Sequence, residues 1–139
     1  MEAVNADEAF ELGNLLRDTA VALGEWRVSH RGNLSQHEWD ELDEREIALL
    51  NSASGMYTGA IGLVLADSGF AVARLQSSVK GAKTAIGRIA VFKQALDLAS
   101  ALILLAGAIT SGNVAALPAA VVSLEDAAAA VLSYADSDD

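Results

Sequence analysis

The sequence predicts an all-α protein, an up-and-down bundle of four helices. The 139 residues are 53% hydrophobic but only 5% aromatic, and there is one proline, Pro118. This composition is typical of helices that pack through small side chains, with few obligatory breaks. Apolar residues also recur at spacings of three and four over long stretches. We therefore expect helices over residues of about 6–31, 36–67, 70–110 and 117–134.

One apolar stripe predicts the first helix, residues 6–31. Its members recur at spacings of three and four, and most charged residues lie off the stripe, as in an amphipathic helix with one buried face. The stripe consists of Leu12, Leu16, Thr19, Leu23, Trp26 and His30. We expect His30 to be partly buried and hydrogen-bonded.

The start of the second helix is marked by a capping box. Ser35 occupies the N-cap position and Glu38 the third helical position, where each side chain can bind the backbone N–H of the other residue. Leu34 and Trp39 occupy the two positions of a hydrophobic staple. Gly32-Asn33 lies just upstream, as expected where the preceding helix ends. These signals place the helix start at residue 36.

The second half of this helix carries a strip of small residues. Residues 51–66 contain no charge, and within them Gly55, Gly59, Gly62 and Ala66 repeat at spacings of four, three and four. A glycine inside a helix costs about 1 kcal/mol relative to alanine. Close approach of a neighbouring helix is the usual reason for such a strip, so these four residues form a predicted contact surface.

The third helix, residues 70–110, is predicted by an unbroken three-four alternation that is typical of antiparallel helix packing. Gly81 and Gly87 are the points at which it would kink or break. The alternation runs through Val72, Leu75, Val79, Ala82, Ile86, Ile89, Lys93, Leu96, Ser100, Ile103, Gly107 and Thr110. With residues 36–67 this segment would form one long antiparallel hairpin.

Charge segregation supports that hairpin. Every charged residue from 68 to 96 is basic, whereas the charges early in the second helix are mostly acidic. If the chain folds back near residue 68, Arg88 and Lys93 lie opposite Asp43, Glu44 and Glu46. Exposed pairs of this kind contribute only about 0–1 kcal/mol each, so they would specify orientation more than stability.

The last helix, residues 117–134, follows Gly112-Asn113, which suits the left-handed conformation common after a helix end. Pro118 fits its first turn. Residues 135–139 read as a short acidic tail. We find no linker or repeat, and we expect a single helical domain over residues 1–139.

The net charge of −10 argues against nucleic acid as a partner, because phosphate binding requires a basic surface. The absence of cysteine excludes disulfides and thiolate chemistry. The acidic N-terminus is unlike a Sec-type signal peptide. The compartment stays open, being cytoplasmic by default or reached by a signal-less export route.

The segment with the most distinctive composition is the uncharged hairpin, residues 98–124, where Thr110–Asn113 and Pro118 interrupt an apolar run. It is either the buried tip of a bundle, a surface that docks another copy or partner, or a hairpin that enters a membrane. In broad pattern it is similar to the apolar hairpins of α-helical pore-forming toxins, and the resemblance covers about a quarter of the chain. The predicted contact residues here are Leu98, Leu102, Leu104, Leu105, Ile109 and Val121.

Catalytic patterns are not found in the sequence, which contains no nucleophile elbow, phosphate-binding loop or dinucleotide fingerprint. His30 and His37 lack metal-ligand spacing, so we expect no metal and no cofactor. The carboxylates of the acidic face, defined as Asp40, Asp43, Glu44 and Glu46, lie in a run of charges, as on a solvated helix. They form a second candidate surface, for a basic partner.

These observations favour a non-enzymatic interaction or assembly protein. It would self-associate or dock a protein partner through the small-residue apolar faces of its helices. The alternative is a membrane-active helical protein that inserts residues 98–124 and meets anionic head groups with the basic residues of the third helix. An enzyme is the least favoured class.

Overall fold

The computed structural model describes residues 6–57 and 70–137, and within these ranges the secondary structure is helical, without strands. The all-α class is therefore confirmed. The helices are α1 (Ala6–Ser29), η1 (Arg31–Asn33), α2 (Gln36–Gly55), α4 (Val72–Ile86), α5 (Phe92–Thr110), η2 (Val114–Ala116) and α6 (Leu117–Ser137).

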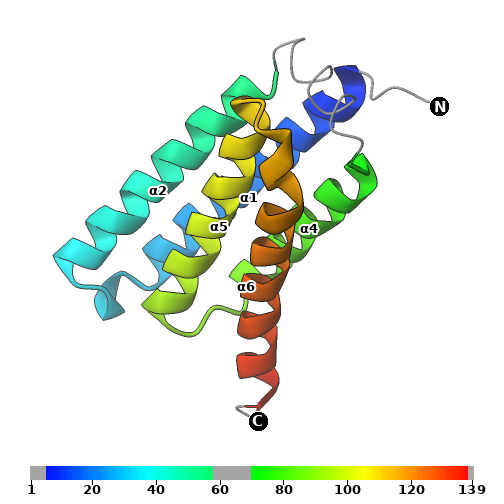
Figure 1. The fold of residues 1–139 in the computed structure, drawn as a ribbon. Coiled ribbons are helices and arrows are strands. Elements are labelled where there is room, and N and C mark those ends of the chain that lie inside the picture. The colour runs from blue at the N-terminus through cyan, green and yellow to red at the C-terminus, as the bar shows by residue number, and fades with distance from the viewer. Residues whose placement is uncertain (1–5, 58–69, 138–139) are drawn as a thin grey trace.

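The five α-helices within the described residues pack as a ring around one core (Figure 1). Helix α1 packs against α2 and α4, α2 also packs against α5, and α6 lies between α5 and α4. The four-helix arrangement is not confirmed, because two helices, α4 and α5, stand in place of the single helix predicted over residues 70–110.

The break between α4 and α5 begins at Gly87, the C-cap of α4. The Trp26 indole N–H of α1 donates a buried hydrogen bond of 3.1 Å to the carbonyl of Ile89, which fixes the connection against α1. The Ala90 N–H donates to the Gln94 side-chain oxygen at 2.9 Å and so satisfies a free donor at the start of α5. The break is held by specific bonds on both sides.

This break changes the helix pairing. Helix α2 packs against α5, not against α4, so the predicted long hairpin of residues 36–67 and 70–110 is wrong. The predicted charge pairing changes with it. Asp43 and Glu46 bind Arg27 of α1, while Lys93 pairs with Asp97 one turn along α5.

Two of the predicted helix ends are confirmed. Both bonds of the capping box are present, with the Glu38 N–H donating to Ser35 Oγ at 3.1 Å and the Ser35 N–H donating to Glu38 Oε1 at 2.9 Å. At the end of α5, Gly112 has a φ of 75°. The Asn113 N–H donates to the Ala108 carbonyl and the Gly112 N–H to the Ile109 carbonyl, which together make a Schellman motif.

Other boundaries differ from the prediction. Helix α1 ends at Ser29 and is followed by the short helix η1. Helix α2 ends at Gly55, and the rest of the predicted helix, from residue 58 to 67, lies outside the described residues. Helix α6 continues to Ser137, so the beginning of the predicted acidic tail is helical.

The core is built mainly from leucine and alanine, as the composition indicates. Most of the predicted stripe of α1 is buried, including Thr19, whose hydroxyl donates to the Leu15 carbonyl at 2.6 Å. His30 is partly exposed and stacks on Trp26. The largest fully buried side chains are Leu12, Leu16, Leu23, Leu42, Leu49, Met56, Leu75, Leu98, Leu102, Leu105 and Ile109.

The closest approach of α1 to the end of α2 depends on Gly13. A Cβ atom on Gly13 would lie 2.9 Å from the Met56 Cβ and 3.0 Å from a ring carbon of Tyr57. The Met56 Cβ is fixed to the backbone and cannot rotate away. The two helices can therefore approach this closely only because residue 13 has no side chain.

We expect Gly13→Ala to lower the free energy of unfolding by about 1–2 kcal/mol, because overpacking outweighs the helix propensity gained. Gly81→Ala is the matched control within α4, since its Cβ would meet nothing within 4 Å. It should raise stability by about 0.5–1 kcal/mol. Urea denaturation of both variants checks this, and equal stabilisation by the two would contradict the close crossing.

Candidate functional site

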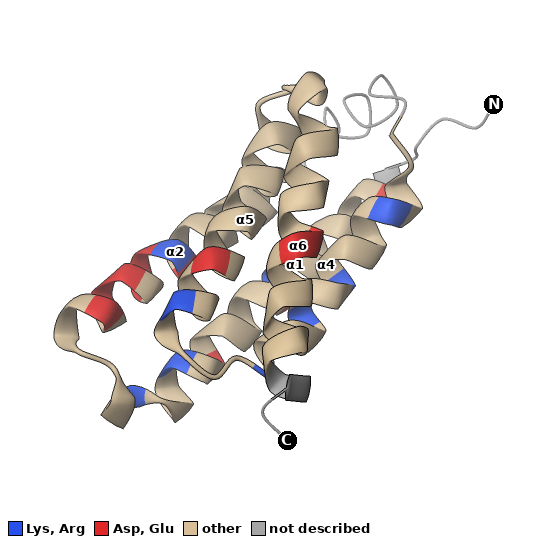
Figure 2. Ribbon diagram, turned by 60° about the horizontal axis from the view of Figure 1, so that its bottom comes forward, with Lys and Arg blue, Asp and Glu red and all other residues tan. Residues whose placement is uncertain are grey.

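The uncharged hairpin forms one end of the bundle, where α5 and α6 join. Helix α5 and α6 pack against each other along this stretch, and Figure 2 shows their connected ends without a charged residue. The charged residues lie on the other helices and farther along α5 and α6 (Figure 2). The segment that looked distinctive in the sequence thus forms one end of the bundle in space.

Most of the predicted contact residues of the hairpin face the interior of the chain itself. They belong to the core that α5 shares with its neighbours α2 and α6. Those fully buried are Leu98, Leu102, Leu105, Ile109 and Val121. They are available to another molecule only if the bundle opens.

Leu104 is the exception, since it is 63% exposed on the outer face of α5. Val122, on α6, is 46% exposed and was missed by the sequence reasoning. The sequence signal for Val122 was its position: it directly follows Val121, which is on the apolar stripe of the last helix, and so it lies off that stripe. These two side chains are the large apolar groups that the hairpin presents to solvent.

Within the predicted glycine strip, Gly55 makes the kind of contact that was expected. A Cβ atom there would lie 3.2 Å from the Thr110 methyl group and 3.9 Å from the Thr110 Cβ, so the end of α5 packs closely on this residue. The contact joins two helices of one chain. Gly59, Gly62 and Ala66 lie outside the described residues.

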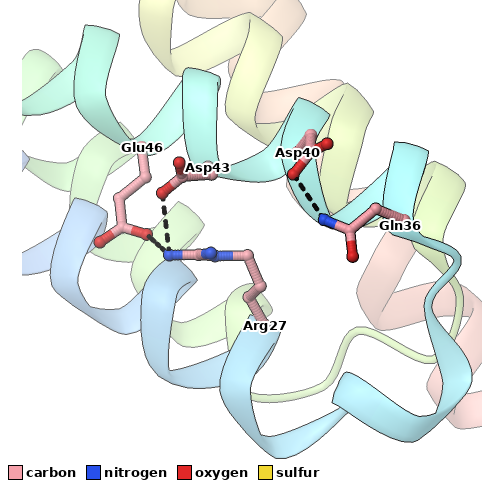
Figure 3. Close-up of polar contacts among 5 residues, drawn as sticks. All are labelled: Arg27, Gln36, Asp40, Asp43 and Glu46. Atoms are coloured by element: carbon pink, nitrogen blue, oxygen red, sulfur yellow. Dashed lines mark hydrogen bonds and ion pairs between the residues drawn. The ribbon is translucent and has the colours of Figure 1, made fainter.

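The acidic face divides into an inner and an outer part (Figure 3). Arg27 Nη2 lies 2.8 Å from Glu46 Oε2 and 3.3 Å from Asp43 Oδ1, and its side chain is only 12% exposed. Asp40 accepts a hydrogen bond of 2.9 Å from the Gln36 amide, and Glu44 is exposed. About half of the predicted acidic surface is therefore engaged by α1.

Two residues of α1 that the sequence reasoning did not select hold the inner part together. The Arg27 guanidinium lies 4.3 Å from the centre of the Trp39 ring as well as against the carboxylates. A Cβ on Gly24 would lie 2.6 Å from Glu46 Oε1, so the Glu46 carboxylate packs directly on the backbone of Gly24. The sequence signal for these two residues was that a glycine and an arginine lie directly beside the apolar stripe of the first helix.

A second polar cluster joins α4 to α6. Arg74 donates to Glu125 at 2.9 Å, and the Ser78 hydroxyl donates to the same carboxylate at 3.1 Å. The hydrogen bond from Arg74 lowers the pKa of Glu125 below its usual value and raises the pKa of Arg74. Glu125, just beyond the uncharged hairpin, is thus held as a carboxylate.

The polar side chains of the two clusters bind one another, and His30, which lies outside both clusters, contacts Trp26. His30 Nδ1 lies 2.9 Å from the Trp26 carbonyl, which only accepts, so Nδ1 carries the proton. The His30 and Trp26 rings stack with centres 4.2 Å apart. Among residues 6–57 and 70–137, no three histidine or carboxylate side chains gather in a way that could hold a metal ion.

Comparison of the chain with protein-family models, with curated proteins and with solved structures found no match.

Proposed function

We propose that this protein is a non-enzymatic, self-associating helical protein, in which the outer face of the α5–α6 hairpin docks on the same face of a second copy. The observation that carries the proposal is the exposure of Leu104, at 63%, on a hairpin without charges. A leucine on such a surface gains about 1.5–3 kcal/mol when it is fully buried. Large exposed apolar patches mark interaction sites, and Leu104 and Val122 are the exposed large apolar residues of this hairpin.

Electrostatics favours this face over the others for contact between two copies. Each chain carries a net charge of −10, so most approaches bring like charges together. Repulsion between exposed charges is screened beyond about 8–10 Å at physiological salt. The uncharged hairpin lets two copies meet with their charges held farthest apart.

The outer face of α6 also suits close helix packing. Ala119, one turn before Val122, and the adjacent Ser123 are exposed, so a second helix meets small side chains beside Val122 on the side toward the α5–α6 connection, whereas Asp126 lies one turn beyond it. Small residues let helix backbones approach and increase the number of van der Waals contacts. The proposed interface thus contains Leu104 and Val122, with small residues beside them toward the α5–α6 connection.

We expect Leu104→Asp to weaken self-association by at least about a hundredfold, or about 3 kcal/mol, because the variant loses apolar burial and brings a carboxylate into the interface. Sedimentation equilibrium over a concentration series measures the effect. Ile47→Asp is the matched control, an exposed aliphatic residue on α2, and it should leave the mass unchanged. A wild-type protein that stays monomeric at all concentrations contradicts the proposal.

One observation supports a second candidate, a membrane-active protein. Helix α5 and the segment Val114–Tyr134 are long and apolar enough to cross a bilayer by length and composition. Buried helices of soluble proteins meet the same criterion, and half of the apolar window in α5 is buried. Insertion would require α5 to leave α2, exposing the core leucines of both. Leakage of dye from vesicles, abolished by Leu104→Asp, is the result expected from this alternative.

A further inference from the structure

The outer edges of α1 and α4, two helices that pack side by side, carry exposed charges of opposite sign. On α1, Glu11, Asp18 and Glu25 recur at a spacing of seven, which places them in one row along the helix. On α4, which contains no acidic residue, Lys80 and Lys83 are exposed one turn apart. A hollow of about 250 Å³ lies between Lys83 and the carboxylates Asp18 and Glu25. The acidic row and the basic pair therefore border one surface.

We call this surface the α1–α4 face and define it by Asp18, Glu25, Lys80 and Lys83. None of these four side chains forms an ion pair with residues 6–57 or 70–137. Arg74 of the same helix, by contrast, is bound by Glu125. The α1–α4 face thus presents charges of both signs that a group outside the chain can bind.

The surface between the two charged edges is low, because its residues are small. Ala22 of α1 lines the hollow beside Asp18 and Glu25. A second hollow, of about 310 Å³, continues along the same two helices to Gly87, which is exposed and adds no side chain. Small residues let the helices of another molecule approach closely, so a partner can bring its own charges within reach of both edges.

A face that is acidic along one edge and basic along the other is complementary to itself. If a two-fold axis runs between α1 and α4, parallel to them, the α1 of each copy lies over the α4 of the other. The rotation keeps every residue at its own level along the axis, so Lys83 of one copy meets Asp18 and Glu25 of the other, and each pair occurs twice. An axis across the helices would instead place α1 on α1, with acid against acid.

We infer that the α1–α4 face is a second contact between copies of this chain, formed by reciprocal ion pairs between the carboxylates of α1 and the lysines of α4. A net charge of −10 makes copies repel each other over most of the surface, whereas on this face the charges attract. Exposed ion pairs are individually weak and are screened by salt. The contact therefore specifies orientation more than it adds affinity, and it weakens as salt rises.

This contact extends the assembly beyond a dimer. The α1–α4 face uses helices other than α5 and α6, so one copy can hold a second copy through the hairpin and a third through this face. The inference does not rest on the hairpin proposal, because the charged contact forms between copies whether or not their hairpins dock.

The test uses the full chain with Leu104→Asp, which removes the hairpin contact. The basic form adds Asp18→Lys and Glu25→Lys, and the acidic form adds Lys80→Glu and Lys83→Glu. Each form alone has like charges on both edges and should stay monomeric, whereas mixing the two restores every pair. Fluorescence anisotropy of the labelled basic form, titrated with the acidic form, should show saturable binding at low salt and at least about tenfold weaker binding at high salt.

A third variant controls for general attraction between chains of different charge. The α2 form carries Asp40→Lys and Glu44→Lys, both exposed on α2, and has the same net charge as the basic form. It should bind the acidic form at least about tenfold more weakly than the basic form does. Equal binding would mean attraction by net charge alone and would overturn the inference. Circular dichroism establishes that the three forms fold.

A conservative variant keeps the test decisive if a reversed form does not fold. The Leu104→Asp chain should self-associate at low salt, and adding Glu25→Gln with Lys83→Gln, which keeps both shapes, should weaken this association at least about tenfold. A Leu104→Asp chain that stays monomeric at low salt, or a glutamine variant that associates as before, would overturn the inference. The hairpin proposal is judged from the effect of Leu104→Asp on the mass of the natural chain, so the two can fail independently.

Discussion

A chain in which Gly55 and Thr110 are both replaced by cysteine is expected to form a disulfide that raises the free energy of unfolding by about 3–4 kcal/mol. A Cβ on Gly55 lies 3.9 Å from the Thr110 Cβ, close to the mean of about 3.8 Å in disulfides. The tightest contact of that Cβ, at 3.2 Å, is with the Thr110 methyl group, which the substitution removes. The bond would close a loop of more than fifty residues, and the gain grows with loop length.

Denaturant unfolding with and without a reducing agent measures the gain within one protein. The natural sequence contains no cysteine, so the engineered pair has no competing partner, and the reduced form is its own control. If the oxidised form were no more stable than the reduced one, the close packing of α2 on the end of α5 would be wrong.

The same variant separates the two proposed functions. The disulfide ties α5 to α2, so a hairpin that must leave α2 to enter a bilayer cannot do so until the bond is reduced. Dye release by the reduced form only would support the membrane-active alternative. Self-association through the outer face needs no opening, so under the main proposal the mass of the complex is the same in both forms.

Replacing Arg27 with methionine is expected to lower the free energy of unfolding by about 2–3 kcal/mol. The change keeps most of the side-chain volume but leaves Glu46, with only 19% of its side chain exposed, without the cation beside it. Breaking a fully buried pair costs about 3–5 kcal/mol, and we expect less because nearly half of the Asp43 side chain is exposed. The contact of the guanidinium with Trp39 is lost as well.

Thermal and urea unfolding measure this loss. Arg31→Met is the control, because Arg31 is exposed and lies 4.9 Å from the centre of the same Trp39 ring. Its loss should cost less than about 1 kcal/mol. The double variant Arg27→Met with Glu46→Gln should recover about 1 kcal/mol, since the carboxylate charge goes with its partner. Additive effects of the two changes would show that the pair is not coupled.

The parts of the fold that could be predicted from the sequence are those set by neighbouring residues. The capping box at Ser35 and the left-handed Gly112 each depend on a few adjacent positions, and both are confirmed. Gly81 and Gly87 looked alike in the same pattern, yet α4 continues through Gly81 and ends at Gly87. The bond from Trp26 to Ile89 spans 63 positions, so no local pattern could choose between the two glycines.

The candidate site shows the same limit. Leu104 and Leu105 are adjacent leucines in one apolar run, but the first is exposed and the second is fully buried. Which of them faces solvent depends on the helices that flank α5 in the ring. The acidic face was predicted from composition, but its pairing with Arg27 depends on how α1 and α2 cross. Composition therefore identified the segments, and only packing identified the surfaces.

The ring arrangement has a consequence for the order of folding. Helix α1 with α2, and α5 with α6, are joined by short connections and pack against each other, so each pair can form with little loss of loop entropy. Packing α4 against both α1 and α6, and α2 against α5, joins segments far apart in the chain. Such long-range contacts slow folding relative to a simple up-and-down bundle. We therefore expect ring closure to be the rate-limiting step of folding, and until it occurs the core leucines of the two helix pairs remain exposed to water.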